Sequence, residues 1–378
     1  MKAGPLSGLK AVELAGLGPG SLAAMILADL GADVVRVDRA TPGEELPGAP
    51  KTNPLARGRR SVGINTKAPE GVELVLKLCD TADVFIETFR PGTAERIGLG
   101  PDVMLARNPR LVYGRLTGWG QDGPLAKAAA HDINYAGIVG ALEPNGHAGE
   151  RPAPLPIKIG FCGGGLQLAV GVLAALYERN TSGKGQTVDA SMVDGAALLT
   201  IDLHSGRAAG LWGGNGGENI LDGDAPYYAV YETADNKHVA VGAVEPRLWD
   251  ELVKMLELDA EELPSRIDKS NWPKLREILG CAIAKHTRDE LAARADGTDA
   301  CLTPVLSPSE VVEHPHNVAR GAFVDIDGMI QTTPAPRFDR TPPATPEAPH
   351  AKGSDTEAVL AEIGIADLGA LRDAKVIA

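Results

Sequence analysis

The stretch LKAVELAGLGPGSLAAMILADLGADVVRVD, residues 9–38, determines the expected fold. Residues 9–16 and 32–38 are short apolar runs, and they predict two β-strands. Residues 21–31 carry apolar side chains at helical spacing, and a glycine-rich turn precedes them. A strand, a helix and a second strand in this order form the βαβ unit of a parallel sheet.

The same alternation of strand and helix patterns continues along the chain. Further strands are predicted at residues 61–65, 83–89, 110–116 and 186–192, and helices at 70–82, 137–144, 165–180 and 193–210, with a helical turn around Glu95 and Arg96. This rhythm predicts the fold class: a doubly wound, Rossmann-like large α/β domain.

A different pattern follows the glycine-rich segment 211–226. Residues 227–244 alternate on both sides of the polar turn Asp235–Asn236, which predicts a β-hairpin. Helices are predicted after it, so this part forms a smaller α+β domain. The expected division is a large domain at 1–200, a linker at 201–223, the small domain at 224–310, and a second linker and closing segment at 311–378, with helices at 247–258, 272–285, 287–295 and 356–364 and extended, proline-rich chain at 331–355.

Composition limits the classes of function. The 378 residues carry a formal charge of −13, which argues against general nucleic-acid binding but allows a small anion held by local arginines. The four cysteines form no CxxC pair and the histidines have no metal-ligand spacing, so no disulfide framework or metal site is expected. No secretory signal and no apolar run of membrane-spanning length are visible, which favours a soluble, cytoplasmic protein.

A dinucleotide-binding function is one interpretation of the first strand–helix turn. Gly16, Gly18 and Gly20 follow a strand, and the next strand ends in Asp38, the place of a ribose-binding acid. The glycine pattern is incomplete, however, and Arg39 suits a ribose phosphate better than a free hydroxyl pair. An NAD-dependent oxidoreductase is therefore kept as an alternative from a different class.

Several charged side chains stand where strands or turns end. In a parallel sheet these ends meet at one edge, where ligands bind, and cations there suit a polyphosphate. His131 and Asp132 mark the expected start of a helix, where a neutral imidazole is available as a base and the aspartate could serve as an N-cap. Glu245 ends the hairpin and precedes a helix. The cations at the strand and turn ends are Arg39, Lys67, Arg90 and Arg96.

The stretch IKIGFCGGG, residues 157–165, places Phe161 and Cys162 directly before three glycines and a long apolar run. We expect a turn at the glycines whose backbone N–H groups point at a ligand in front of the helix. Such donors would suit a developing oxyanion.

These segments together resemble the family III CoA transferases of the CaiB/BaiF type, the group that contains the α-methylacyl-CoA racemases, and the bacterial racemase branch most. The resemblance covers residues 5 to about 340. It rests on GPLSGLKAVELAGLGPG, ADLGADVVRVDR, ETFRPGTAERIGLGP, LTGWGQDGP, HDINYAGI, SGKGQTVDASMVDG, APYYAVYETADNKHVAVGAVEP and CLTPVLSPSEVVEHPHNVARG.

The resemblance implies an interlocked homodimer, with the closing segment returning to the large domain and each active site between the large domain of one chain and the small domain of the other. His131 matches the catalytic histidine, and Glu245 the supporting glutamate from the partner. No cofactor is implied beyond the CoA moiety of an acyl-CoA. Its nucleotide is expected on Arg39, Ile64, Asn65, Thr66, Lys67, Thr88, Arg90 and Arg96, and its thioester near Ala130, Asn134 and Tyr135.

The implied reaction is racemisation or epimerisation of a 2-methylacyl-CoA through an enolate, an isomerase activity of lipid metabolism. It needs acid/base groups on both faces of the α-carbon. An alignment without gaps places Phe161 where the family has an aspartate, which argues against acyl transfer by the family mechanism. Glu245, Asp132, Cys162 or a water then serves the second face. The alternatives are one-base isomerase or lyase chemistry, and binding of acyl-CoA without turnover.

Overall fold

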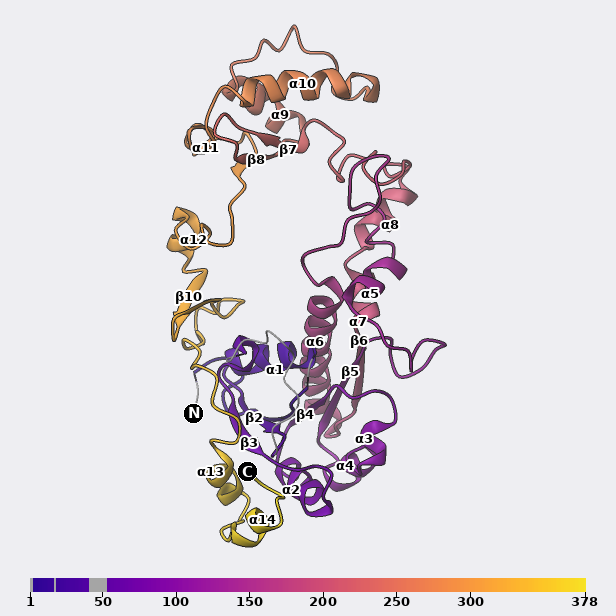
Figure 1. The fold of residues 1–378 in the computed structure, drawn as a ribbon, viewed down its shortest axis with the longest axis vertical. Coiled ribbons are helices and arrows are strands. Elements are labelled where there is room, and N and C mark those ends of the chain that lie inside the picture. Colours follow the sequence, from indigo (N-terminus) through magenta and orange to yellow (C-terminus); the bar gives the residue numbers. More distant parts are fainter. Residues whose placement is uncertain (1–2, 17, 41–52) are drawn as a thin grey trace. The chain divides into compact units, whose positions relative to one another are not determined.

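The structure is a computed structural model that describes residues 3–16, 18–40 and 53–378. The chain forms two compact units (Figure 1). The large unit comprises Met1–Val139, Ile157–Leu199 and Val318–Ala378, and the small unit comprises Gly140–Pro156 and Thr200–Asn317. The domain boundaries expected at residues 200, 223 and 310 stay predictions.

A six-stranded, fully parallel sheet forms the centre of the large unit. Its strands lie in the order β3-β2-β1-β4-β5-β6, so the winding reverses between β1 and β4. This is the doubly wound arrangement expected from the sequence, and it opens a crevice at the carboxyl ends of the strands. The strands are β1 (Lys10–Leu14), β2 (Asp33–Asp38), β3 (Arg60–Gly63), β4 (Val84–Glu87), β5 (Val112–Thr117) and β6 (Thr187–Ser191).

Helices cover both faces of this sheet, and the alternation of side chains along β1 assigns the two layers. Ala11 packs into a cluster with α1 (Gly20–Asp29) and α6 (Ile159–Ser182). Val12 and Leu14 pack on the other face with four further helices, one of which is the predicted closing helix. These four are α2 (Pro69–Cys79), α4 (Pro101–Arg107), α13 (Thr356–Glu362) and α14 (Gly369–Asp373).

The helices after β5 differ from the prediction. Helix α5 spans Asp132–Ile138, so the predicted helix 137–144 is wrong beyond Ile138, and Gly140 follows with a φ of +80°. The predicted helix 193–210 is two helices, α7 (Met192–Leu198) and α8 (Ile201–Ala208), with Thr200 between them.

The turn predicted at the glycine triplet is also wrong. Helix α6 begins at Ile159, and Gly163, Gly164 and Gly165 lie inside it. They are buried because neighbouring backbone comes close: a Cβ at Gly163 would overlap Gly195, and one at Gly165 would lie 2.9 Å from the carbonyl oxygen of Pro19. The glycines therefore serve close packing against α7 and α1 rather than ligand binding.

Helix α6 also passes the length and hydropathy test for a membrane span, as no other helix of the described residues does. Half of its most apolar window is buried inside the protein, which is typical of a core helix.

The small unit contains the predicted hairpin, β7 (Tyr228–Glu232) and β8 (His238–Gly242), and a third antiparallel strand, β9 (Leu302–Pro304). Asn236 takes the left-handed conformation in the turn, with a φ of 55°. Three amphipathic helices form one apolar core with this sheet, which confirms a smaller α+β part. They are α9 (Pro246–Met255), α10 (Trp272–Ile283) and α11 (Arg288–Ala295), with the short turn η2 (Lys269–Asn271) before α10.

The remaining elements are short. The hairpin of β10 (Phe323–Ile326) and β11 (Met329–Thr332) was missed, since each strand has only four residues. Residues 342–350 have no regular secondary structure, as the proline-rich sequence predicts. The other short elements are η1 (Pro54–Ala56), α3 (Thr93–Arg96), the expected helical turn, and α12 (Pro315–Arg320).

Candidate active site

His131 is the N-cap of helix α5, at the carboxyl end of the sheet. Its backbone is extended, its side chain is exposed, and its N–H donates to the side-chain oxygen of Asn134 at 2.9 Å. The backbone N–H of Asn134 in turn donates to the carbonyl oxygen of His131 at 2.9 Å. This reciprocal turn fixes the backbone and leaves the imidazole available to a ligand.

Asp132 joins the start of α5 to the start of α6. Its Oδ1 accepts the N–H of Phe161, in the first turn of α6, at 2.8 Å. A carboxylate there is stabilised by the unpaired N–H groups and the dipole of the helix start. Oδ2 accepts no hydrogen bond from the described residues, so one oxygen is anchored and the other is available.

Tyr135 supports this corner from the next turn of α5. The residue is buried, its ring meets Trp119 edge-on at 4.7 Å, and its hydroxyl donates to the carbonyl oxygen of Ala130 at 3.4 Å. Gly118 is required because a Cβ there would overlap the tyrosine hydroxyl. Burial, and then the charge of Asp132, raise the pKa of Tyr135, so the phenol stays protonated.

The first residues of α6 complete the corner. Burial raises the pKa of the Cys162 thiol, with Asp132 contributing in the same direction, which disfavours a thiolate base. The ring of Phe161 lies 5.9 Å from Nζ of Lys158, a cation that sequence reasoning did not single out.

The side-chain position of Gly160 lies next to Asp132. Gly160 is buried, and a Cβ there would lie 3.1 Å from Oδ1 of Asp132. That Phe161 replaces a family aspartate stays a prediction.

The expected nucleotide-binding residues occupy the carboxyl ends of β2, β3 and β4. Arg39, Lys67 and Arg90 are exposed there, and Asn65 fixes the turn after β3 by accepting the N–H of Lys67 at 3.1 Å. Ile64 is buried, Thr66 is half-buried beside it, and exposed Arg96 donates to Thr93 of α3 at 2.9 Å. The sheet thus brings these groups to the same edge as His131.

The side chain of Thr88 explains why two glycines are needed in the turn between β1 and α1. A Cβ at Gly16 or Gly20 would overlap the side chain of Thr88, which lies across the reversal between β1 and β4. The two glycines are therefore needed for contact with a protein side chain, not for contact with a pyrophosphate.

Asp38 also differs from a ribose-binding acid. It is buried, and its Oδ2 accepts Arg36 at 2.8 Å and Ser61 at 2.6 Å. These contacts occupy the carboxylate within the sheet and remove support from the NAD interpretation.

A buried ion pair that the sequence analysis missed fixes the turn with Thr88 and Arg90. Glu87 is fully buried, accepts the N–H of Phe89 at 2.6 Å and pairs with Arg115 at 3.2 Å. Burial raises the pKa of Glu87, while Phe89 and Arg115 oppose that shift. The visible signal was an acidic residue inside the apolar strand pattern of residues 83–89.

Glu245 belongs to the small unit. It is exposed and is the N-cap of α9, where its backbone is extended and Pro246 begins the helix. A proline suits this first position because its missing N–H would have no partner there.

Within the described residues, no group of three His, Cys, Asp or Glu side chains could hold a metal ion.

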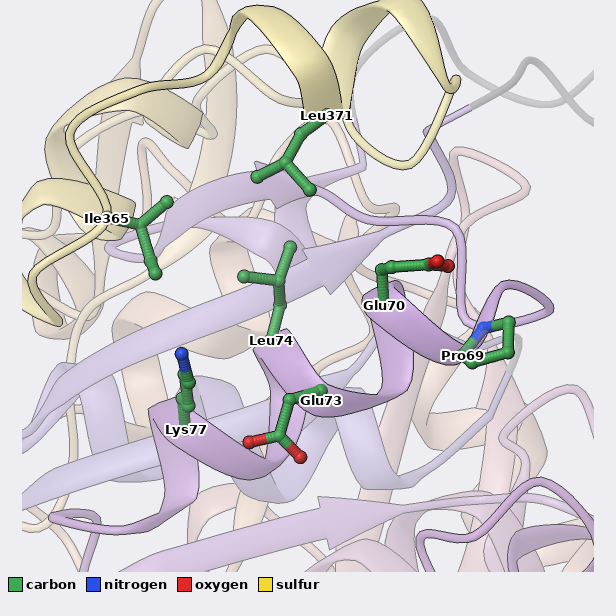
Figure 2. Close-up of a pocket in the computed structure, with 7 residues that line it drawn as sticks. All are labelled: Pro69, Glu70, Glu73, Leu74, Lys77, Ile365 and Leu371. Atoms are coloured by element: carbon green, nitrogen blue, oxygen red, sulfur yellow. The ribbon is translucent and has the colours of Figure 1, made fainter.

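A cavity of about 400 Å³ lies between α2 and the chain around α14 (Figure 2). Glu73 in its wall is paired with Arg107 at 2.8 Å. None of the lining residues belongs to the corner around His131, so the cavity is separate from the candidate site. It is lined by Pro69, Glu70, Glu73, Leu74, Lys77, Ile365 and Leu371.

Strand order and side-chain placement define the class: a doubly wound α/β protein with its titratable and cationic groups at the carboxyl edge of the sheet. The chain belongs to CoA-transferase family III, whose family model matches residues 6–356. This confirms the family expected from the sequence.

Individual relatives agree with this assignment. The chain is similar to the α-methylacyl-CoA racemases of Mus musculus (44% identity) and Homo sapiens (43%), in each case over 95% of this chain and 93% of the relative. It is also similar to the crystal structure of a CaiB/BaiF family protein from Brucella suis, with a TM-score of 0.82, 26% identity, and coverage of 96% of this chain and 100% of that one.

Proposed function

We propose that this protein is an isomerase that racemises 2-methylacyl-CoA thioesters through an enolate. The observation that carries the proposal is the 44% identity to an α-methylacyl-CoA racemase over 95% of the chain. The position of His131 and Asp132 at one corner of the sheet edge adds support.

His131 is the first base in this mechanism. The extended backbone at the start of α5 presents its imidazole to a ligand, and an imidazole can both take up and return a proton. It removes the α-proton next to the thioester carbonyl, and the electron pair moves to the carbonyl oxygen. The backbone N–H groups of Ile159 and Gly160 in the first turn of α6, in place of the glycine triplet, are proposed to stabilise that oxygen.

Asp132 is the second acid/base group in this proposal. Its anchored Oδ1 holds the side chain at the start of α6, and Oδ2, when protonated, delivers its proton to the opposite face, which leaves a carboxylate at Asp132 and a protonated imidazole at His131. Cys162 and Tyr135 are weaker candidates because burial raises the pKa of both groups. The partner's Glu245 is proposed to support His131 across the dimer.

The CoA moiety is proposed to extend along the sheet edge. Four strand-to-strand steps separate β3 from β5 in the order β3-β2-β1-β4-β5. At about 4.8 Å a step, the cations beside β3 lie about 19 Å from the strand that precedes α5. A ligand with phosphates at one end of a long pantetheine chain and its reacting carbon at the other suits that separation. No cofactor beyond the CoA moiety is proposed.

One-base chemistry is the second candidate, and the apolar Phe161 at the start of α6 favours it. In that case His131 removes and returns the proton on one face, and the product is an isomer, an elimination product or an exchanged substrate of retained configuration. Phenylalanine cannot form an acyl anhydride, so CoA transfer through this position is not proposed.

The test is incubation of each enantiomer of a 2-methylacyl-CoA in D₂O, with α-deuterium content and configuration followed together. Racemisation predicts that both enantiomers gain deuterium and lose their configuration. Exchange of one enantiomer with its configuration retained would establish one-base chemistry instead. If neither enantiomer exchanges while CoA still stabilises the fold, the proposed reaction is wrong.

Asp132→Asn separates the role of Asp132 from that of His131. The amide oxygen can still accept the N–H of Phe161, but the acid/base group is lost. We expect racemisation to fall by about 10²- to 10⁴-fold, while one enantiomer still exchanges its α-proton through His131.

The matched control is Asp102→Asn, which removes an exposed carboxylate from the first turn of α4. It is expected to leave both rates unchanged. Racemisation at the wild-type rate by Asp132→Asn would exclude Asp132 as the second base.

The active form is proposed to be an interlocked homodimer. Helix α6 exposes Leu166, Val170 and Tyr177 by 51%, 65% and 81%, at positions that share one helical face. Exposed apolar surface of this kind marks interaction sites. The compartment, expected to be the cytosol, stays a prediction.

Val170→Asp tests this interface because it places a charge in the middle of the apolar face. Light scattering after size exclusion is expected to give the mass of two chains for the wild type and of one chain for the variant. Val103→Asp, on an exposed residue of α4, is the control and should stay dimeric. An undisturbed dimer in Val170→Asp would show that this face is not the interface.

A further inference from the structure

The last four residues of the sequence, Lys375–Ala378, complete the free edge of strand β3. Ile377 forms an antiparallel bridge with Ile64. The N–H of Asn65 donates to the carbonyl oxygen of Val376 at 2.8 Å, and the N–H of Ala378 donates to the carbonyl oxygen of Gly63 at 3.1 Å. Val376 and Ile377 are buried in the same core cluster as β3.

This pairing determines where Lys375 lies. The segment runs antiparallel to residues 63–65, so the residue before Val376 lies beyond the carboxyl end of β3. The side-chain amide of Asn65 donates to the carbonyl oxygen of Lys375 at 3.4 Å, and the same side chain holds the turn that contains Lys67.

Three exposed cations therefore gather at this edge from three parts of the sequence. Asp38 is paired with Gly63 in the sheet, so Arg39 follows β2 beside Ile64, the residue that bridges to Ile377. Lys67 and Lys375 flank the same strand end. Cations that share one strand end repel one another, and an anion bound between them offsets that repulsion.

The backbone of Lys375 gives an independent observation. Its φ is +54°, and it directly follows the C-cap of α14, a position usually taken by glycine. A side chain in the left-handed region costs about 1 kcal/mol. A lysine there is disfavoured on grounds of folding, and such residues are found preferentially at functional sites.

We propose that Lys375 is a phosphate ligand of the acyl-CoA site, and that residues 376–378 hold it against the turn of Asn65 and Lys67. The ligand class is the nucleotide phosphates of a CoA thioester. The inference rests on the proposed function, since it concerns the coenzyme end of the same site.

The test is the Kd of CoA, measured by calorimetry on the full chain, for the wild type, Lys375→Met and Lys375→Arg. Methionine keeps the length of the side chain without its charge. We expect Lys375→Met to weaken CoA binding by about tenfold, the effect of one lost charge-assisted hydrogen bond, and Lys375→Arg to restore it. The control is Lys184→Met, an exposed lysine after α6.

A second arm replaces CoA by 3′-dephospho-CoA. If Lys375→Met weakens only CoA, the 3′-phosphate is the partner; if it weakens both ligands equally, the pyrophosphate is. CoA binding by Lys375→Met as tight as that of the wild type would overturn the proposal while leaving the proposed function intact. A wild-type protein that does not bind CoA would overturn both.

Discussion

Replacing His131 by alanine is expected to slow racemisation of a 2-methylacyl-CoA in both directions by about 10²- to 10⁴-fold, the usual contribution of a positioned acid/base group, and to slow α-proton exchange in the enantiomer whose proton faces His131. Both directions are affected because the same imidazole removes the proton in one and returns it in the other. The measurement is the configuration of the recovered thioester together with its deuterium content after incubation in D₂O. The Kd for CoA should not change, since the phosphate site proposed above lies at the far end of the sheet edge.

The control for this prediction is His316→Ala, which removes an exposed imidazole from α12. It should exchange at the wild-type rate. Full activity of His131→Ala would show that the imidazole has no part in the mechanism. Loss of both CoA binding and α-proton exchange would indicate instead that the substitution disturbs the fold around the start of α5.

Glu13→Gln is expected to have the largest effect on stability. Glu13 and Arg59 form a salt bridge that is at most 2% exposed, and Ser21 donates to the same carboxylate at 2.7 Å. Nε and Nη2 of Arg59 have no hydrogen-bond partner among the described residues. Burial lowers the pKa of this guanidinium and Glu13 opposes the shift, yet an arginine stays charged in a protein.

Without Glu13 the buried charge is left unpaired, which costs about 3–5 kcal/mol. Hydrogen exchange of the β1, β2 and β3 amides measures this loss in the large unit alone. Glu73→Gln is the matched control, because its pair with Arg107 is 47% and 32% exposed and such surface pairs contribute about 0–1 kcal/mol.

The double variant Glu13→Gln, Arg59→Met should recover most of the stability, because the uncompensated charge is then gone. A single variant as stable as the wild type would show that Arg59 finds another partner or water.

The strands were predictable because their signal is local. Residues 32–38 and 83–89 are apolar runs between turns, and the structure places β2 and β4 within them. The predicted start of helix α6 was too late because glycine has a low helix propensity. Only the close contacts of the three glycines with Gly195, Met192 and Pro19 explain why they lie in a helix.

The same difference between local and long-range features holds for the candidate site. His131 and Asp132 lie in one short motif, so they could be proposed from the sequence. The hydrogen bond from the N–H of Phe161 to Asp132 could not be predicted, because the two residues are 29 positions apart. The position of Lys375 at the sheet edge could not be predicted for the same reason, because it depends on a contact with Asn65, which lies 310 residues earlier in the sequence.

The discontinuity of the large unit has a consequence for folding during synthesis. Residues 200–317 of the small unit are contiguous, whereas the edge strand β3 needs contacts from Asp355, Thr356 and Glu362, 294, 293 and 302 residues further on. Because domains fold as the chain emerges, the small unit can form while β3 still lacks its cover. The final assembly of the sheet edge therefore waits until residues 355–378 have been synthesised, and until then the outer edge of β3 is exposed to other nascent chains.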